Sequence, residues 1–340
     1  MKEIIECVPN FSEGKNEETI KLIADAISST DECKLLNCEP DKNYNRVVVT
    51  FVGTKKGVLN GAINASLIAS QKIDMTTHKG EHPRLGAIDV VPFIPIKNVA
   101  VDDCVEISKE YGKIISQKLN IPIYLYESAA AKPARVNLSN IRKGEYEGLK
   151  EKLKDPEWLP DFGKPEFNPK LGGTVTGSRF FLIAYNVNLR TEDVKIADEI
   201  AQTIRESGKI LRDENGNAVK KDGKTVRIPG KLQAVKAMGV SLENFKMTQV
   251  SINLVNYLTT NVHQAFEAVK EEAKKYNVEI WGSEIVGLVP LDALIESGKY
   301  YSPNEVSETK LVNSAVQNLG LNNLANFNPS EKVIEYLIRE

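Results

Sequence analysis

The chain has 340 residues, of which 41% are hydrophobic and 26% are charged, and its formal net charge is −2. This composition is typical of a soluble globular protein, and the length predicts two domains rather than one core. The near-neutral net charge gives no sign of a chain-wide surface that binds nucleic acid or anionic membrane. The sequence has no run of 18 apolar residues, so we expect no membrane-spanning helix. The N-terminal MKEIIECVPN lacks the pattern of a signal peptide.

Strands and helices alternate along the first half of the chain. Asn16 is a favoured N-cap residue, Glu17 and Glu18 suit a first helical turn, and apolar residues then recur at helical spacing. Runs rich in β-branched residues, bounded by turn residues, predict the strands. The predicted order is a strand at Glu3–Val8, a helix after Asn16, strands at 34–38 and 46–53, a helix at Thr54–Ala69 and a strand at 87–96.

The second half repeats this order. A strand at 179–189 is followed by a helix at 191–208, with Thr191 as its predicted cap. The remaining predicted elements are strands at Leu232–Met238 and Met247–Val255, a helix at Thr260–Tyr276 and a strand at 279–290. Two β-α-β-β-α-β units predict an α/β (α+β) fold with mixed or antiparallel sheets and a duplicated architecture.

Three segments lie outside the repeated pattern. Asp155–Ser178 has four prolines and a glycine-rich end, and it predicts a boundary between domains at 1–178 and 179–340. Residues 210–231 are polar and turn-rich, which predicts a surface excursion with a hairpin near Asp213–Gly216. The segment Asn328–Glu340 is typical of a capped amphipathic helix. The four cysteines form no C-x-x-C pair, so we expect reduced thiols in a cytoplasmic protein.

The stretch HKGEHPRLGAIDVVPFIPI holds two of the three histidines of the chain, His78 and His82. HKGEH matches the zinc-binding pattern H-x-x-E-H, which requires a helix that places both imidazoles on one face. Gly80 lies between the histidines, and Pro83 disfavours the helical conformation at His82. We therefore expect no metal site here.

A polar loop before a buried strand is a frequent location of catalytic groups. An imidazole can accept and donate a proton near neutral pH, so one of the two histidines is a candidate general acid or base. The spacing alone does not choose between His78 and His82. The alternative is a structural role in packing the loop.

Several longer motifs resemble glutamate formimidoyltransferase, which forms the front part of the animal formimidoyltransferase-cyclodeaminase. They are CVPNFSEG (7–14), NRVVVTFVG (45–53), HKGEHPRLGAIDVVPFIPI (78–96), PIYLYESAA (122–130) and PDFGKPEFNPKLGGTVTGSRFFLIAYNVNL (160–189). The resemblance implies two tandem ferredoxin-like subdomains, a homodimer and a transfer of the formimidoyl group between N-formimidoyl-L-glutamate and tetrahydrofolate in histidine degradation. Because the sequence ends at Glu340, we expect a stand-alone transferase.

The resemblance also assigns residues. It implies that His82 is the catalytic acid and base, which leaves His78 a supporting role and makes Glu81 a neighbour that tunes His82. Tetrahydrofolate is then a co-substrate rather than a bound cofactor. The folate segment of the family corresponds to Gly163, Lys164, Pro165, Glu166, Phe167, Asn168, Pro169, Lys170, Leu171 and Gly172.

Both implied substrates carry carboxylates, which the forked guanidinium of arginine binds through two parallel hydrogen bonds. Arg46, Arg84 and Arg179 lie in the matched motifs and are candidate ligands, with Lys79 as a weaker one. The alternative for each is an ordinary surface ion pair.

The formimidoyl group is amidine-like and can be cationic, so a nearby carboxylate would hold it. Glu39 and Asp41 are candidates, and a solvated turn is the alternative for both. Asn10 is a candidate substrate contact or a stabiliser of its own turn. Phe167 either packs on the flat pterin or fills a small core.

Three other hypotheses remain open from the sequence. The same pocket and histidine would serve formyl transfer from 5-formyltetrahydrofolate, or its cyclisation. A zinc hydrolase built on H-x-x-E-H is a more remote possibility. A ferredoxin-like module that binds a partner without turnover is the third.

Overall fold

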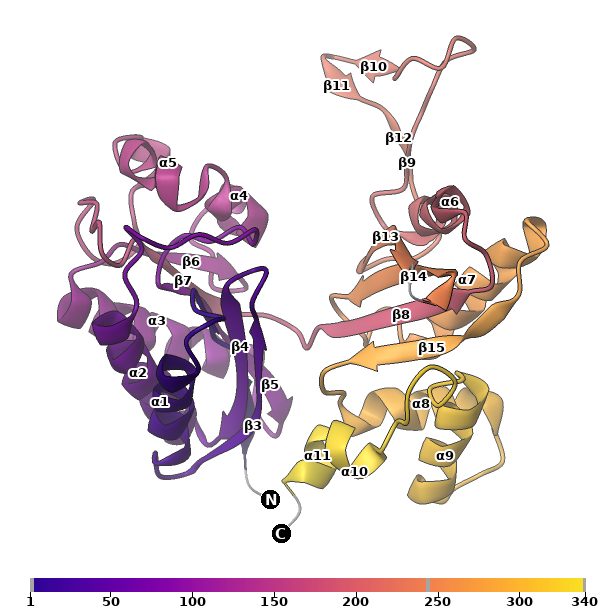
Figure 1. Cartoon of the computed structure of the whole chain (residues 1–340), viewed down its shortest axis with the longest axis horizontal. Coiled ribbons are helices and arrows are strands. Elements are labelled where there is room, and N and C mark those ends of the chain that lie inside the picture. Colours follow the sequence, from indigo (N-terminus) through magenta and orange to yellow (C-terminus); the bar gives the residue numbers. More distant parts are fainter. Residues whose placement is uncertain (1–2, 243–244, 339–340) are drawn as a thin grey trace. The chain divides into compact units, whose positions relative to one another are not determined.

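The computed structural model describes residues 3–242 and 245–338, and the chain divides into two compact units after Arg179. Both units combine helices with β-sheet, so the chain has a mixed α/β fold, as predicted (Figure 1). Within the described part of the chain, no helix is both long and apolar enough to cross a membrane.

Unit 1 is built on one seven-stranded sheet. β4 lies between β3 on one side and β1 and β2 on the other, and both β1 and β2 also pair with β5; all these pairs are antiparallel. β5, β7 and β6 continue the sheet as parallel neighbours. The strands are β1 (Ile4–Cys7), β2 (Asn10–Phe11), β3 (Cys33–Asp41), β4 (Arg46–Gly53), β5 (Ile88–Lys97), β6 (Ile123–Glu127) and β7 (Thr174–Ser178).

The two predicted helices of this unit are confirmed. The Asn16 side chain accepts a hydrogen bond from the backbone N–H of Thr19, and Thr54 caps the second helix through Gly57 in the same way. These contacts satisfy N–H groups that have no partner in the first turn of a helix. The helices are α1 (Glu17–Ser28), α2 (Lys55–Lys72), α3 (Val101–Leu119), α4 (Leu138–Arg142) and α5 (Glu145–Lys152).

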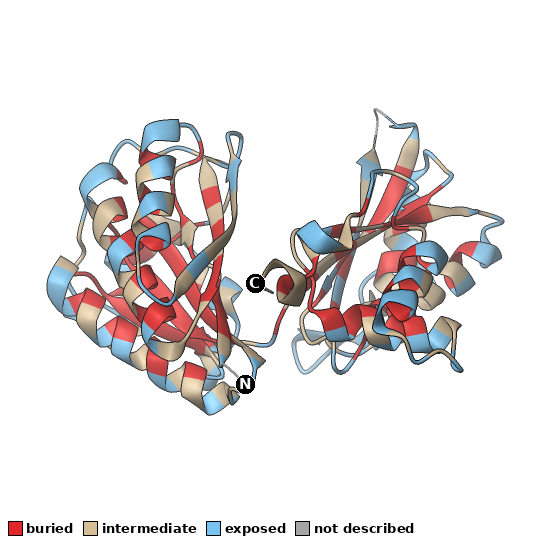
Figure 2. Cartoon of the chain, turned by 90° about the horizontal axis from the view of Figure 1, so that it is seen from below, coloured by how far each residue is buried: buried red, intermediate tan, exposed pale blue. Residues whose placement is uncertain are grey.

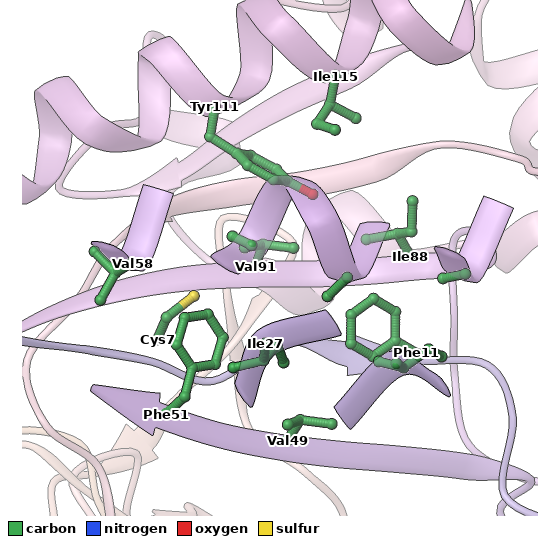
Figure 3. Close-up of a cluster of buried hydrophobic side chains, with 14 of the residues drawn as sticks. Cys7, Phe11, Ile27, Val49, Phe51, Val58, Ile88, Val91, Tyr111 and Ile115 are labelled. Atoms are coloured by element: carbon green, nitrogen blue, oxygen red, sulfur yellow. The ribbon is translucent and has the colours of Figure 1, made fainter. Parts of the chain in front are cut away.

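The main core of unit 1 lies between the sheet and α1, α2 and α3, and buried residues line the facing sides of both layers (Figure 2). Figure 3 shows Phe51 and Val91 from the sheet and Tyr111 from α3 among the side chains of this core. A second cluster, which includes Val90, packs β5, β6 and β7 under α4 and α5. β5 is therefore covered on both faces, which explains its nearly continuous run of apolar residues.

The glycine-rich end of the predicted boundary segment forms a buried strand of unit 1, which was not predicted from the sequence. β7 lies between β5 and β6, and the Thr174 hydroxyl donates to the carbonyl of Ile88 at 2.6 Å. A Cβ on Gly177 would lie 2.3 Å from the Tyr126 carbonyl oxygen, so glycine is needed for this close approach. α3 and β6 were likewise not predicted from the sequence.

Unit 2 contains a four-stranded antiparallel sheet in the order β13-β14-β8-β15. The predicted strands and both predicted helices are confirmed, but the cap of α6 is Asp193 rather than Thr191. The strands are β8 (Ile183–Leu189), β13 (Val235–Leu242), β14 (Met247–Leu254) and β15 (Ile280–Val286), and the helices of the repeat are α6 (Val194–Ile204) and α7 (Val262–Lys275).

The C-terminal part of unit 2 differs from the prediction. α8 (Leu291–Tyr301) and α9 (Glu308–Asn318) were not predicted. The expected single helix from Asn328 is divided into α10 (Pro329–Lys332) and α11 (Ile334–Leu337), because Val333 is extended and forms a parallel bridge with Val289. Residues 339–340 of that prediction lie outside the described residues.

Residues 209–228 form an arm that projects from unit 2 (Figure 1). Its base pairs β9 (Lys209–Ile210) with β12 (Arg227–Ile228), and its far end pairs β10 (Lys220–Lys221) with β11 (Lys224–Thr225). The predicted turn is present, with the backbone N–H of Gly216 donating to the Asp213 carbonyl at 3.0 Å. The surface excursion is therefore confirmed, and it contains a second hairpin.

Candidate active site around His82

The loop between α2 and β5 carries both histidines and has no helix between His78 and Gly86. His78 Nε2 lies 2.9 Å from the carbonyl oxygen of Asn45, whereas His82 Nε2 lies 2.7 Å from Nη1 of Arg46. The two imidazoles therefore have different partners. Among the residues that the structure describes, no cluster of three or more His, Cys, Asp or Glu side chains is arranged to hold a metal ion.

The contact with Arg46 fixes the protonation of His82. A guanidinium only donates, so Nε2 must accept and the hydrogen of the neutral imidazole resides on Nδ1. Burial lowers the pKa of His82 to about 4, and the positive charges of Arg46 and Arg142 contribute in the same direction. His82 is consequently an uncharged base at neutral pH.

Arg46 extends from the first residue of β4 on the face of the sheet opposite the main core. Its Nη1 also donates to Oδ1 of Asn10 at 3.3 Å, and its guanidinium carbon lies 5.8 Å from the centre of the Tyr44 ring. Burial lowers the pKa of Arg46. Its Nε is buried without a hydrogen-bond partner among the described residues.

Asp89 anchors the end of the loop. One of its carboxylate oxygens accepts from the backbone N–H of Leu85 at 2.8 Å, and its other oxygen pairs with Nη2 of Arg142 on α4. The Ser12 hydroxyl donates to the carbonyl of Gly86 at 2.8 Å. These bonds connect the loop to three separate parts of unit 1, so they restrict where His82 can lie.

Arg84 has carboxylate partners of its own. Its guanidinium donates to Glu145 at 2.8 Å and to both carboxylate oxygens of Glu147, and its Nε lies 3.4 Å from Nδ1 of His78. The predicted carboxylate-binding face of Arg84 is therefore occupied by α5. Beside it lies a cavity of about 410 Å³, lined by His78, Lys79, Gly80, Arg84, Gly144, Glu145 and Glu147.

The segment Gly163–Gly172 runs along the same loop. The backbone N–H of Met75 donates to the Lys170 carbonyl at 2.8 Å, and that of Ala87 donates to the Leu171 carbonyl at 2.9 Å. Gly86 and Gly172 form an antiparallel bridge. The structure thus brings the predicted folate segment into direct contact with the loop that carries His82.

The side chains of this segment divide into two groups. Residues 163–166 and 169–170 are exposed, whereas Leu171 and Gly172 are buried. The Phe167 ring packs against Tyr146, with ring centres 5.4 Å apart, and lies against the second core cluster. Asn168 accepts from the backbone N–H of Leu171 and stabilises the turn. The Phe167 ring is thus only partly buried, and it packs against this cluster from outside.

The other predicted substrate contacts are distributed differently. Asn10 lies beside Arg46, as described. Asp41 is paired with Arg46 across β3 and β4, but its carboxylate accepts from the backbone N–H groups of Asn43 and Tyr44 and so stabilises the turn. Glu39 is exposed and contacts Asn37. Arg179 lies instead directly after β7 and near Tyr126; burial raises the pKa of Tyr126 to about 12, and the charge of Arg179 opposes this rise.

Several residues around His82 were not predicted from the sequence. His82 is enclosed by Ser12, Tyr44, Asn45, Arg46, His78, Arg84 and Asp89, which leave no space for a water molecule between them. Asp89 could have been found from the sequence, because a carboxylate inside the apolar run AIDVVPF is expected to be buried and must then have a partner. Arg142 could not have been found, since an arginine on a short polar helix is usually exposed. The tuning role expected of Glu81 belongs to Arg46, Arg142 and Asp89.

Comparison with known proteins gives matches along the chain. A family model described as the formiminotransferase domain, N-terminal subdomain, matches residues 4–179, and one described as the formiminotransferase domain matches residues 184–339. The chain is 42% identical to the glutamate formimidoyltransferase of Streptococcus pyogenes, with 88% of this chain and 94% of that protein covered. It is 43% identical to the protein of the same name from Thermoplasma acidophilum, with 88% and 92% covered.

The chain is also 45% identical to the formimidoyltransferase-cyclodeaminase of Dictyostelium discoideum over its whole length. It spans 61% of that longer protein, and 60% of the similarly named rat protein.

Proposed function

The chain belongs to the formiminotransferase family, and we propose that it is a glutamate formimidoyltransferase. The proposed reaction transfers the formimidoyl group between N-formimidoyl-L-glutamate and tetrahydrofolate, giving 5-formimidoyltetrahydrofolate and L-glutamate, within histidine degradation. The printed names of the Streptococcus and Thermoplasma relatives, at 42% and 43% identity, support this assignment.

The contact between the predicted folate segment and the loop of His82 is the structural observation that supports this proposal. The predicted folate segment is hydrogen-bonded to the loop of His82, through Lys170 and Met75 at 2.8 Å and through Leu171 and Ala87 at 2.9 Å. A folate held by this segment would therefore lie close to an uncharged imidazole. Proton transfer by a positioned base contributes about 10²–10⁴-fold to a rate.

The proposed chemistry needs one proton shuttle. An amine nitrogen of tetrahydrofolate attacks the formimidoyl carbon and forms a tetrahedral intermediate. Nε2 of His82 takes the proton from the attacking nitrogen, and the resulting imidazolium donates it to the glutamate nitrogen as the carbon–nitrogen bond breaks. The proton count balances, because the proton lost by folate is the one gained by glutamate.

Arg46 and Asn10 are the proposed contacts for a carboxylate of formimidoylglutamate, since both lie beside His82. Arg179 remains a weaker candidate for binding a carboxylate, and Glu39 and Asp41 remain weaker candidates for holding the cationic formimidoyl group. We assign Arg84 a positioning role, because Glu145 and Glu147 already occupy its guanidinium.

Several finer features belong to the same proposal. The order of the four strands β5-β1-β4-β3 in unit 1 and β15-β8-β14-β13 in unit 2 supports ferredoxin-like cores in both units. A homodimer, a cytoplasmic location and a reaction without a metal are expected from the family resemblance. Sedimentation of the purified chain would test the homodimer.

A second activity is compatible with the same site. Formyl transfer from 5-formyltetrahydrofolate, or its cyclisation, would use the same folate segment and the same imidazole. The donor group alone distinguishes it from formimidoyl transfer.

A spectroscopic assay tests the proposed function. The purified chain is mixed with tetrahydrofolate and formimidoylglutamate, with formylglutamate as a parallel donor, and the absorbance of the folate product is followed. The matched control is His263→Gln, which alters a histidine of unit 2 that stacks on Tyr300. We expect product with formimidoylglutamate in the wild type and in this control. The absence of a new folate species with either donor would overturn the proposal.

A further inference from the structure

The contact between Arg46 and His82 poses a mechanistic problem. Nη1 of Arg46 lies 2.7 Å from Nε2 of His82, so a permanent donor occupies the lone pair that a base uses to take a proton. The other imidazole nitrogen, Nδ1, carries the hydrogen and is buried without a hydrogen-bond partner among the described residues. The imidazole can accept a proton from substrate only after the guanidinium moves.

Arg46 is also incompletely partnered. The ion pairs nearby belong to other arginines: Arg84 pairs with Glu145 and Glu147, and Arg142 pairs with Asp89. Among the described residues, Arg46 pairs with no carboxylate, its Nε has no hydrogen-bond partner, and Asn10 accepts from it at a long 3.3 Å. A buried guanidinium nitrogen without an acceptor is rare, and it indicates that a group is missing from this site.

We propose that Arg46 is a substrate-responsive latch, which covers Nε2 of His82 in the free protein and is drawn off it by a carboxylate of the substrate. The carboxylate supplies the acceptor that Nε of Arg46 lacks, and a guanidinium binds it through two parallel hydrogen bonds. This inference rests on the proposed function, because that function supplies the carboxylate.

The latch couples binding to chemistry. Once the guanidinium has moved, the lone pair of Nε2 is exposed to the attacking nitrogen of the acceptor. Nε2 then takes one proton from that nitrogen and passes the same proton to the leaving glutamate nitrogen. Without the carboxylate of formimidoylglutamate beside Arg46 the base stays covered, so tetrahydrofolate bound alone meets a blocked imidazole.

The groups that face His82 come from four parts of unit 1. Arg46 extends from β4, Arg142 from α4, Asp89 from β5, and Tyr44 from the turn before β4, with its ring centre 5.9 Å from that of His82. Asp89 holds Arg142 in an ion pair, so Arg46 is the cation that is able to leave. Its movement would raise the pKa of His82 above the value of about 4, although burial still keeps it below about 6.5.

The test is an NMR titration of the intact chain with ¹⁵N-labelled histidine. The chain has three histidines, so His78, His82 and His263 can be assigned by single glutamine substitutions. Nitrogen shifts report both the tautomer and the pKa of each ring. The samples are the wild type, Arg46→Met, Arg46→Lys and the matched control Arg190→Met, which removes a guanidinium that stacks on Trp281 in unit 2.

In the free wild type we expect His82 to stay neutral, with its hydrogen on Nδ1, until the pH approaches 4. Arg46→Met should titrate at a higher pH, whereas Arg190→Met should match the wild type. Saturating L-glutamate should move the wild-type His82 signal in the same direction as Arg46→Met and leave that variant unchanged. The His78 signal, which comes from the same unit as Arg46, reports whether unit 1 of each variant is folded.

Two results would overturn the latch. The first is a His82 titration that is the same in Arg46→Met and the wild type. The second is a wild-type His82 signal that stays constant at every glutamate concentration; the wild-type series and Arg46→Lys keep this test valid if Arg46→Met does not fold. The ligand-free titration needs no turnover, so failure of the latch can be distinguished from failure of the proposed transferase activity.

Discussion

The crossing of Gly86 and Gly172 is the point where the folate segment meets the loop of His82, and it predicts a graded effect of added methyl groups. Gly172 has φ +68°, and a Cβ there would lie 2.4 Å from the Leu85 carbonyl oxygen and 2.8 Å from the Gly86 Cα. Gly172→Ala therefore introduces both backbone strain and a steric clash. The clashing atoms belong to the backbone, so they cannot rotate away as a flexible side chain can.

Two other glycines separate these effects. Gly144 has φ +88°, but its nearest neighbour for a Cβ is the Gly148 Cα at 3.6 Å, an ordinary contact. Gly144→Ala should thus cost only the left-handed strain, about 1–2 kcal/mol. Gly86 has no such strain, but a Cβ there would lie 2.3 Å from the Leu171 carbonyl oxygen, and overpacking of this kind costs about 1–3 kcal/mol. The sum predicts about 2–5 kcal/mol for Gly172→Ala.

Fluorescence can measure this in unit 1 alone. Trp158 lies in unit 1 and Trp281 in unit 2, and the chain has no other tryptophan. In a Trp281→Phe background, urea unfolding followed by Trp158 gives the free energy of unfolding of unit 1. We expect Gly172→Ala to lose clearly more than Gly144→Ala and to raise the KM for tetrahydrofolate. Equal losses in the two variants, with an unchanged KM, would refute the close crossing.

Three further predictions follow from the same region. Asp89→Asn should lower the free energy of unfolding of unit 1 by about 3–5 kcal/mol, because it leaves the Arg142 guanidinium half-buried and unpaired. In the urea assay, the double variant with Arg142→Met should recover part of this loss. Losses that simply add in the double variant would contradict the pairing. The wild type should lose stability relative to His82→Gln as the pH falls from about 6.5 to about 4. In this pH range the imidazole of residue 82 binds a proton in the unfolded chain but not in the native protein. A difference in free energy of unfolding between the two proteins that is the same at every pH would contradict the lowered pKa. Dialysis against a chelator should leave turnover unchanged, because the imidazoles of His78 and His82 are held by Asn45 and Arg46, and a loss that zinc restores would contradict this prediction.

Local signals in the sequence predicted much of the fold. The cap at Asn16, the helical spacing of apolar residues and the β-branched runs predicted the elements of both repeated units, because these signals depend on neighbours within a few residues. β7 was not predicted, since its glycines resemble a linker until the partner strand is known. Position 177 requires glycine because the Tyr126 backbone lies against it, and the sequence does not reveal that contact.

The site was predicted less completely than the fold. Pro83 and Gly80 correctly indicated a loop without a helix, and that excluded the shared face a zinc pair requires. The contact of His82 with Arg46 joins residues 36 positions apart, and the partners of Arg84 lie about 60 positions away. Charge type and spacing cannot tell which arginine faces a carboxylate of the protein and which one is left for a ligand.

The most direct test of the central claim is the kinetics of His82→Gln with formimidoylglutamate and tetrahydrofolate. Glutamine keeps a polar side chain of similar reach but cannot carry the proton. We predict that kcat falls by about 10²–10⁴-fold while the Kd for tetrahydrofolate stays within about twofold of the wild type, because the folate segment is held by backbone hydrogen bonds. Turnover close to that of the wild type would contradict the assignment of His82 as the proton shuttle.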